Sequence, residues 1–189
     1  MLYGAMGFAA EVKVPAFDQW IFQTGDWAVT DEGLLHTTRE GNNTNAYVAL
    51  PQQGAKHIYE WTGEFAVDGE RRIMNGGLHV LCSDGAAVQR QSGYMIWQDA
   101  TKIDIYRVTA NAARIIYSFN TGWPIDTTKL PLKHTYRFVV DGEAKKLSVY
   151  RDNVLVGEVA DDVYTSGEYI SVRTNRSTTL FSDIKYWAE

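Results

Sequence analysis

The C-terminal part of the chain, residues 134–187, alternates between apolar and polar side chains with a period of two. His134–Val140 alternates and ends at Asp141-Gly142-Glu143, and Lys146–Arg151 alternates and ends at Asp152-Asn153. Such alternation, interrupted by Asp, Asn and Gly, is typical of antiparallel hairpins that bury one face. The segment therefore predicts a sheet with one buried face and one face free to bind a ligand.

The same pattern runs through the rest of the chain, with turn residues about every 8–12 positions. We expect further strands at Glu11–Val14, Trp20–Gln23, Asp26–Thr30, Leu34–Thr38, Ala46–Ala49, Ile58–Val67, Gly77–Cys82, Tyr94–Gln98, Lys102–Val108, Ala113–Phe119, Val154–Val159, Glu168–Arg173 and Phe181–Trp187. Helix signals are nearly absent. The pattern predicts an all-β protein, a two-sheet antiparallel β-sandwich of the jelly-roll type, with a barrel as the alternative. We expect a single domain over residues 1–189, with residues 1–10 as an N-terminal extension.

Composition and charge exclude several partners. The net charge is −5, and no basic cluster is longer than Arg71-Arg72 or Lys145-Lys146, so we expect no nucleic-acid partner. No stretch reaches the roughly 18 apolar residues of a membrane span, and the first residues lack the basic start of a signal peptide. The lone Cys82 excludes an intrachain disulfide and fits a buried, unreactive thiol. We favour an extracellular, periplasmic or virion-surface location, although a chain without disulfides also fits the cytoplasm.

The order of the motifs resembles the concanavalin A-like lectin/glucanase jelly-roll superfamily. It is most similar to the 3-keto-disaccharide hydrolase-like domains and the related fructan-binding modules. The motifs are Phe17–Trp20, Gly25–Leu35, Asn75–Val80, Gly93–Asp99, Ile105–Arg107, His134–Val140, Leu147–Asp152 and Phe181–Tyr186. The resemblance covers Phe17 to Trp187 and implies a jelly roll that binds ligands on a concave sheet. Met95 and Trp97 depart from the family pattern, which has a polar residue and a glutamine there, so the family's ligand chemistry is not carried over.

Side-chain alternation in three of these strands sorts core from surface positions. The predicted core positions are Leu78, Val80, Cys82, Tyr94, Ile96, Ile103 and Ile105. The predicted outward positions are His79, Leu81, Met95, Trp97, Asp99, Asp104 and Tyr106.

Aromatic rings stack on sugars, and planar polar groups bond to their hydroxyls. The ligand-binding residues that we predict are Asn75, His79, Trp97, Asp99 and Tyr106. A tryptophan in a sandwich strand is often part of the core, and a histidine is often structural, so the prediction depends on their sharing one face. Arg71-Arg72 and Trp123-Pro124 are further candidates for a rim, although such residues are commonly plain surface or loop anchors.

The search for catalytic residues is mostly negative. Glu60 and Glu64 share one face of a strand but lie roughly 13 Å apart, beyond the roughly 5–9.5 Å of glycosidase pairs. The chain has no Gly-x-Ser-x-Gly elbow, His-Glu-x-x-His motif or phosphate loop. Asp18, Asp183 and Asp161-Asp162 could supply oxygen ligands to a structural Ca²⁺, but such residues commonly form turns. We therefore assign no catalytic residue, no metal ligand and no other cofactor.

Three functions remain at this point. The first is a non-catalytic, lectin-like module that binds an oligo- or polysaccharide on the concave face. The second is a structural or adhesion module of a virion or cell-surface assembly, forming a homo-oligomer through the apolar segment Met1–Phe8. The third is a glycan hydrolase or lyase with His79 and Asp99 as an acid–base pair. Fold-level resemblance does not choose among them.

Overall fold

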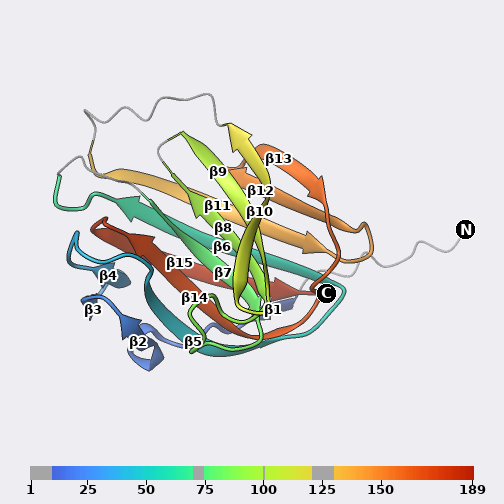
Figure 1. The fold of residues 1–189 in the computed structure, drawn as a ribbon, viewed down its shortest axis with the longest axis horizontal. Coiled ribbons are helices and arrows are strands. Elements are labelled where there is room, and N and C mark those ends of the chain that lie inside the picture. Colours follow the sequence, from blue (N-terminus) through green and yellow to red (C-terminus); the bar gives the residue numbers. More distant parts are fainter. Residues whose placement is uncertain (1–9, 70–74, 100, 121–129) are drawn as a thin grey trace, which may run out of the picture.

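The chain folds into two antiparallel sheets in the computed structural model, which describes residues 10–69, 75–99, 101–120 and 130–189. The eight-stranded sheet has the order β13-β12-β11-β6-β15-β4-β3, with β1 paired to β15. The seven-stranded sheet has the order β10-β9-β8-β7-β14-β5-β2. Strands far apart in the sequence thus lie side by side, and the two sheets form the layers of a sandwich (Figure 1). The predicted all-β, two-sheet fold is confirmed.

The strands match the predicted segments closely. Those of the eight-stranded sheet are β1 (Ala10–Val12), β3 (Trp27–Val29), β4 (Leu34–His36), β6 (Lys56–Phe65), β11 (Leu132–Asp141), β12 (Lys146–Arg151), β13 (Val154–Ala160) and β15 (Thr179–Ala188). Those of the seven-stranded sheet are β2 (Ile21–Thr24), β5 (Thr44–Gln52), β7 (Asn75–Cys82), β8 (Gly93–Gln98), β9 (Lys102–Thr109), β10 (Ala112–Asn120) and β14 (Gly167–Asn175). One 3₁₀ turn, η1 (Phe17–Gln19), completes the described elements, and none of the described helical structure is long or apolar enough to cross a membrane.

Local turn chemistry fixes the C-terminal hairpins. Asp152 and Asn153 join β12 to β13, and both have a positive φ, of 51° and 64°. Two consecutive residues in this conformation form the tight turn that matches the twist of a hairpin, and Asp and Asn tolerate it well. Arg151 and Val154 therefore pair directly across this turn, and the register of β12 with β13 shifts further along, between Val149 and Tyr150.

One hydrophobic cluster fills the space between the sheets. The eight-stranded sheet contributes stacked rings, such as Trp61 and Tyr136 with centroids 5.3 Å apart. The seven-stranded sheet contributes mainly aliphatic side chains, among them Leu78, Val80, Ile96, Ile103, Ile105, Ile170 and Val172. At one side of the sandwich, a Cβ on Gly157 of β13 would lie 2.1 Å from the ring of Phe119 in β10. The absence of a side chain at Gly157 lets the edges of the two sheets meet.

The predicted orientation of Leu81 is wrong. Leu81 was expected to point outward, but it is fully buried in the core cluster. The cause is a bulge in β7, because the register with β14 shifts between Tyr169 and Ser171 and Leu81 has a φ of 54°. One extra residue reverses the alternation at the end of the strand. The backbone N–H of Leu81 donates to Oε1 of Gln52 at 2.9 Å, which satisfies it inside the sandwich.

Candidate ligand-binding site

Two rows of side chains cross the outer face of the seven-stranded sheet, because the antiparallel register places them next to each other. The first row contains Tyr47, Ser171, His79, Met95 and Tyr106. The second row contains Asn45, Arg173, Gly77, Trp97 and Asp104. Their neighbours along each strand belong to the core, so the predicted outward placement of His79, Trp97, Asp104 and Tyr106 is confirmed.

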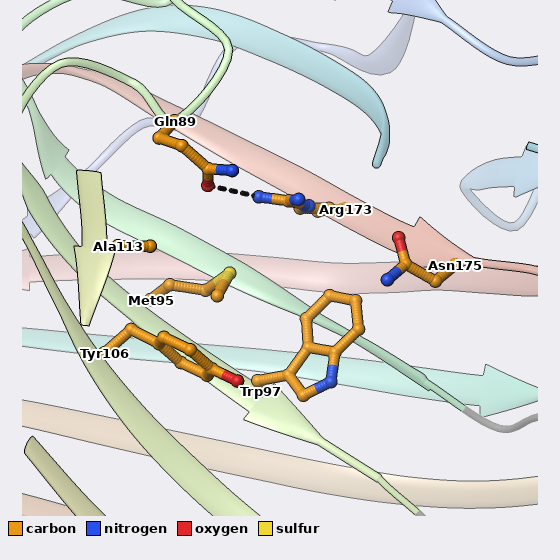
Figure 2. Close-up of a pocket in the computed structure, with 7 residues that line it drawn as sticks. All are labelled: Gln89, Met95, Trp97, Tyr106, Ala113, Arg173 and Asn175. Atoms are coloured by element: carbon orange, nitrogen blue, oxygen red, sulfur yellow. Dashed lines mark hydrogen bonds between the residues drawn. The ribbon is translucent and has the colours of Figure 1, made fainter. Parts of the chain in front are cut away.

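These rows lie beside a pocket of about 170 Å³. It is lined by Gln89, Met95, Trp97, Tyr106, Ala113, Arg173 and Asn175 (Figure 2). Met95 and Trp97 come from β8, Tyr106 from β9, Ala113 from β10, and Arg173 and Asn175 from β14. Gln89 reaches the site from the loop between β7 and β8. The pocket thus combines two aromatic rings with amide and guanidinium groups, and its volume is below the roughly 300 Å³ of small drug-binding pockets.

The contact between Arg173 and Trp97 shapes the pocket. The guanidinium carbon of Arg173 lies 5.9 Å from the centre of the Trp97 ring. Gly77 is paired with both residues in the sheet register and places no side chain between them. A Cβ at Gly77 would lie 1.8 Å from the carbonyl oxygen of Ile96, so only glycine fits at this position.

Arg173 is held by neutral groups only. The residue is only 5% exposed. Nη1 donates to Oε1 of Gln89 at 2.5 Å, Nη2 donates to Oδ1 of Asn43, and Nε has no hydrogen-bond partner. Among the described residues, no carboxylate forms an ion pair with it. Burial, with a smaller effect of Arg90, lowers the pKa of Arg173 to about 10, so the group still carries its charge at neutral pH.

Arg90 attaches the β7–β8 loop to the same sheet. It is fully buried, and Nε donates to Oγ of Ser171 at 2.9 Å. Nη1 donates to the carbonyl oxygens of Gly85 and Ala87, at 2.8 and 2.6 Å, and to Oε1 of Gln23. Four hydrogen bonds therefore hold the loop, and with it Gln89, beside the pocket.

His79 is buried rather than open to a ligand. Its residue is 1% exposed, and neither ring nitrogen has a hydrogen-bond partner. Burial lowers the pKa of His79 well below its usual value of 6.5, and the positive charges of Arg173 and Arg90 lower it further. The imidazole is therefore neutral, and it lies next to Met95 in the register without lining the pocket.

The two predicted aromatic residues do line the pocket. Tyr106 is half-buried, whereas Trp97 is only 7% exposed, so Tyr106 offers the more open ring. In Figure 2 the hydroxyl end of Tyr106 points toward Trp97. The neighbouring Asp104 is already engaged, since its carboxylate lies 2.9 Å from Nζ of Lys102 and accepts a hydrogen bond from Ser118.

The other predicted site residues lie outside the pocket. Asp99 accepts the backbone N–H groups of Thr101 and Lys102 at 2.9 and 3.2 Å, so its carboxylate serves the turn before β9. Asn75 is paired in register with the pocket residue Asn175 but does not line the pocket itself. Arg71-Arg72 and Trp123-Pro124 lie outside the described residues.

Three polar lining residues were not predicted from the sequence: Gln89, Arg173 and Asn175. Alternation in β14, where Ile170 and Val172 are core residues, does place Arg173 on the outer face. The missing information was the pairing of β14 with β7 and of β7 with β8, which brings Arg173 close to Trp97 although the two residues are far apart in the sequence. The position of Gln89 depends on the loop that Arg90 holds, and no local sequence pattern predicts where that loop lies.

The groups proposed for catalysis or metal binding are dispersed. His79 makes no hydrogen bond to Asp99, so the acid–base pair required by the enzyme hypothesis is not formed. Glu60 is paired with Arg137 and Glu64 with Lys133 on the opposite sheet. Asp161, one of the candidates for a Ca²⁺ ligand, accepts hydrogen bonds from Arg107 and Tyr94. Within the described part of the chain, no three His, Cys, Asp or Glu residues gather in a way that could hold a metal ion.

Comparison with known proteins supports the fold. No family model and no curated protein matches the sequence. The structure is similar to the carbohydrate-binding module CBM66 from Bacillus subtilis, with a TM-score of 0.68, 21% identity and coverage of 90% of this chain and 96% of that one. The carbohydrate recognition domain of Emp47p gives a TM-score of 0.64 at 14% identity, covering 94% of this chain and 90% of that one. Sheep galectin-11 gives 0.52 at 12% identity, covering 78% and 98%. The jelly-roll fold implied by the sequence motifs is thereby confirmed.

Proposed function

We propose that the protein is a non-catalytic, lectin-like module that binds an oligo- or polysaccharide at the pocket on the outer face of the seven-stranded sheet. The observation that carries this proposal is the combination of groups lining the pocket. Tyr106 and Trp97 offer ring surface to the C–H groups of a sugar, and Gln89, Arg173 and Asn175 offer hydrogen bonds to hydroxyls. Similarity to a carbohydrate-binding module and to a carbohydrate recognition domain agrees with this proposal.

The dimensions of the pocket favour a short ligand segment. A volume of about 170 Å³ is small, and the pocket is lined by residues of β14, β8, β9 and β10 and of the β7–β8 loop. Such a site would enclose one sugar unit, such as a terminal or branching residue, while further units lie along the sheet. A long aromatic platform for a crystalline polysaccharide would need several exposed rings in line, whereas two rings line this pocket, of which Tyr106 is the more open.

Tyr106→Ala tests the proposal most directly. We expect it to weaken binding by about two- to tenfold, because stacking on one aromatic ring contributes on the order of 0.5–1.5 kcal/mol. Isothermal titration against a panel of soluble glycans measures the effect. Tyr150→Ala is the matched control, since Tyr150 is also half-buried but lies on the outer face of the opposite sheet. Failure of the wild-type protein to bind any glycan at millimolar concentration would contradict the proposal.

A second candidate function is assembly with other copies of the chain, as in a surface or adhesion module. The observation that favours it is a set of exposed apolar side chains on the edge strands β10 and β13, which contact each other: Ile115 and Tyr117, Val154 and Leu155. Exposed edge strands with apolar side chains readily pair with other chains. Light scattering tests this candidate, and a monomer at every concentration would refute it. The segment Met1–Phe8, predicted as the interface, lies outside the described residues.

A further inference from the structure

The outer face of the seven-stranded sheet concentrates unpaired positive charge in a protein with a net charge of −5. Arg173 and Arg90 are both buried, at 5% and 0% exposure, and neither forms an ion pair with a carboxylate of the described residues. Each also keeps one guanidinium nitrogen without a hydrogen-bond partner, Nε of Arg173 and Nη2 of Arg90. Burying a charge without a counter-charge is unfavourable, so an unpaired buried arginine needs an explanation.

The structural role of Arg90 accounts for its burial. Its four hydrogen bonds hold the β7–β8 loop and Ser171 together. Burial lowers the pKa of its guanidinium, and negative charge that includes Asp84 in that loop opposes this shift. Arg173 lacks such a role. It bonds only to the neutral side chains of Gln89 and Asn43, and it lines the pocket beside Trp97.

Contact with the Trp97 ring compensates Arg173 only in part, because a cation–π contact is weaker than a desolvated ion pair. The acidic residue nearest to Arg173 in the sheet register, Asp104, does not neutralise its charge either. Asp104 is paired with Lys102 at 2.9 Å and bonded to Ser118, so its charge is already neutralised. The pocket therefore presents a positive charge next to two aromatic rings.

We propose that the sugar bound in this pocket carries an anionic group, a carboxylate or a sulfate, which pairs with Arg173. This inference rests on the proposed glycan-binding function and names its ligand class. Guanidinium groups bind such oxyanions with two parallel hydrogen bonds, and Gln89 and Asn43 hold the planar group in a fixed orientation. Tyr106 and Trp97 then contact the sugar ring beside the anionic substituent.

An array that presents carboxylated, sulfated and neutral glycans together tests the inference with the wild-type protein. We expect the bound glycans to be acidic, and we expect methyl esterification of the carboxylate, or removal of the sulfate, to weaken binding by at least about tenfold. The esterified and desulfated forms also show which of the two anions is recognised. Binding should weaken further between 50 and 500 mM NaCl, because salt screens the ion pair.

Two variants connect the result to Arg173. Arg173→Gln should remove the preference for acidic glycans, and Arg173→Lys should retain part of it. The matched control is Arg137→Gln on the opposite sheet, where the guanidinium lies 6.0 Å from the ring of Tyr150 but is already paired with Glu60. This control should leave the preference unchanged.

The outcomes separate the two proposals. Binding of neutral glycans that responds to Tyr106→Ala would overturn the anionic ligand and leave the glycan-binding function intact. Acidic binding that survives Arg173→Gln in a folded protein, as judged by its thermal unfolding, would also overturn the role of Arg173. Absence of binding to every glycan on the array would overturn both proposals.

Discussion

The outer faces of the two sheets each place an arginine over an aromatic ring, yet the two arginines differ in their surroundings. Arg173 lies 5.9 Å from the Trp97 ring, is 5% exposed and has no carboxylate partner among the described residues. Arg137 lies 6.0 Å from the Tyr150 ring, has a side chain that is 39% exposed, and donates to Oε2 of Glu60 at 2.8 and 3.1 Å.

The same contrast extends over both faces. On the eight-stranded sheet, Lys56 is paired with Asp141 and Lys146 with Glu158, and the pocket there, of about 330 Å³, is the larger of the two. Its cations are neutralised within the protein. The smaller pocket on the seven-stranded sheet keeps its positive charge. Pocket size and the state of the charges therefore favour different faces, and our proposal follows the charges.

The largest effect is expected at Arg90. Arg90→Met should reduce the free energy of unfolding by about 3 kcal/mol, because it leaves several buried acceptors around Gly85, Ala87 and Ser171 without donors. Urea unfolding followed by tryptophan fluorescence measures this change. Lys145→Met is a suitable control, because Lys145 is an exposed residue whose ion pair with Asp162 lies at the surface. A loss below about 1 kcal/mol would mean that the loop does not depend on Arg90.

Much of the fold could be predicted from the sequence. Alternation and turn residues located the strands, since residues such as Asp152 and Asn153 adopt the conformations their chemistry favours. The exception at Leu81 arises from a bulge, which depends on pairing with β14 and on the side chain of Gln52. Neither partner is visible from the local pattern in β7.

The candidate site was predicted only in part. Trp97 and Tyr106 follow from strand parity, which is local information. His79 shares that parity, but the surrounding arginines and the β7–β8 loop are brought to it by long-range contacts, and these decide its burial. The carboxylate of Asp99 already accepts hydrogen bonds from the backbone N–H groups two and three residues later, in the turn before β9. Parity therefore says which face a residue occupies, and only tertiary structure says whether a ligand can reach it.

The next effect concerns His79 and acid stability. Because its pKa is lowered in the fold, the unfolded chain binds the proton more readily below pH 6.5. Stability should be greatest above pH 6.5 and fall as the pH decreases toward 5, with His36 and His57, whose pKa values burial also lowers, adding to the slope. Each such histidine contributes up to about 1.4 kcal/mol per pH unit.

Two histidine variants, one on each sheet, test this pH dependence. Between pH 7 and 5, the unfolding free energy of His79→Gln should depend less steeply on pH. The difference in slope should correspond to roughly one proton fewer taken up on unfolding. His134→Gln, a change at a partly buried histidine whose Nδ1 lies 2.7 Å from Asp152 on the other sheet, should leave the His79 contribution in place. An unchanged slope in His79→Gln would show that the buried imidazole does not resist protonation.

The smallest effect should come from the ion pair that defines the opposite face. A double-mutant cycle with Arg137→Met and Glu60→Gln should give a coupling of about 0.5 kcal/mol, because both side chains remain partly exposed and solvent screens their attraction. Urea unfolding of the four proteins gives the value, with Lys133→Met and Glu64→Gln as a second pair at a longer distance of 3.6 Å. A coupling above about 2 kcal/mol would place the Arg137 pair among strongly desolvated interactions. The two arginines would then differ only in having a partner, and burial would no longer separate the proposed binding face from the opposite one.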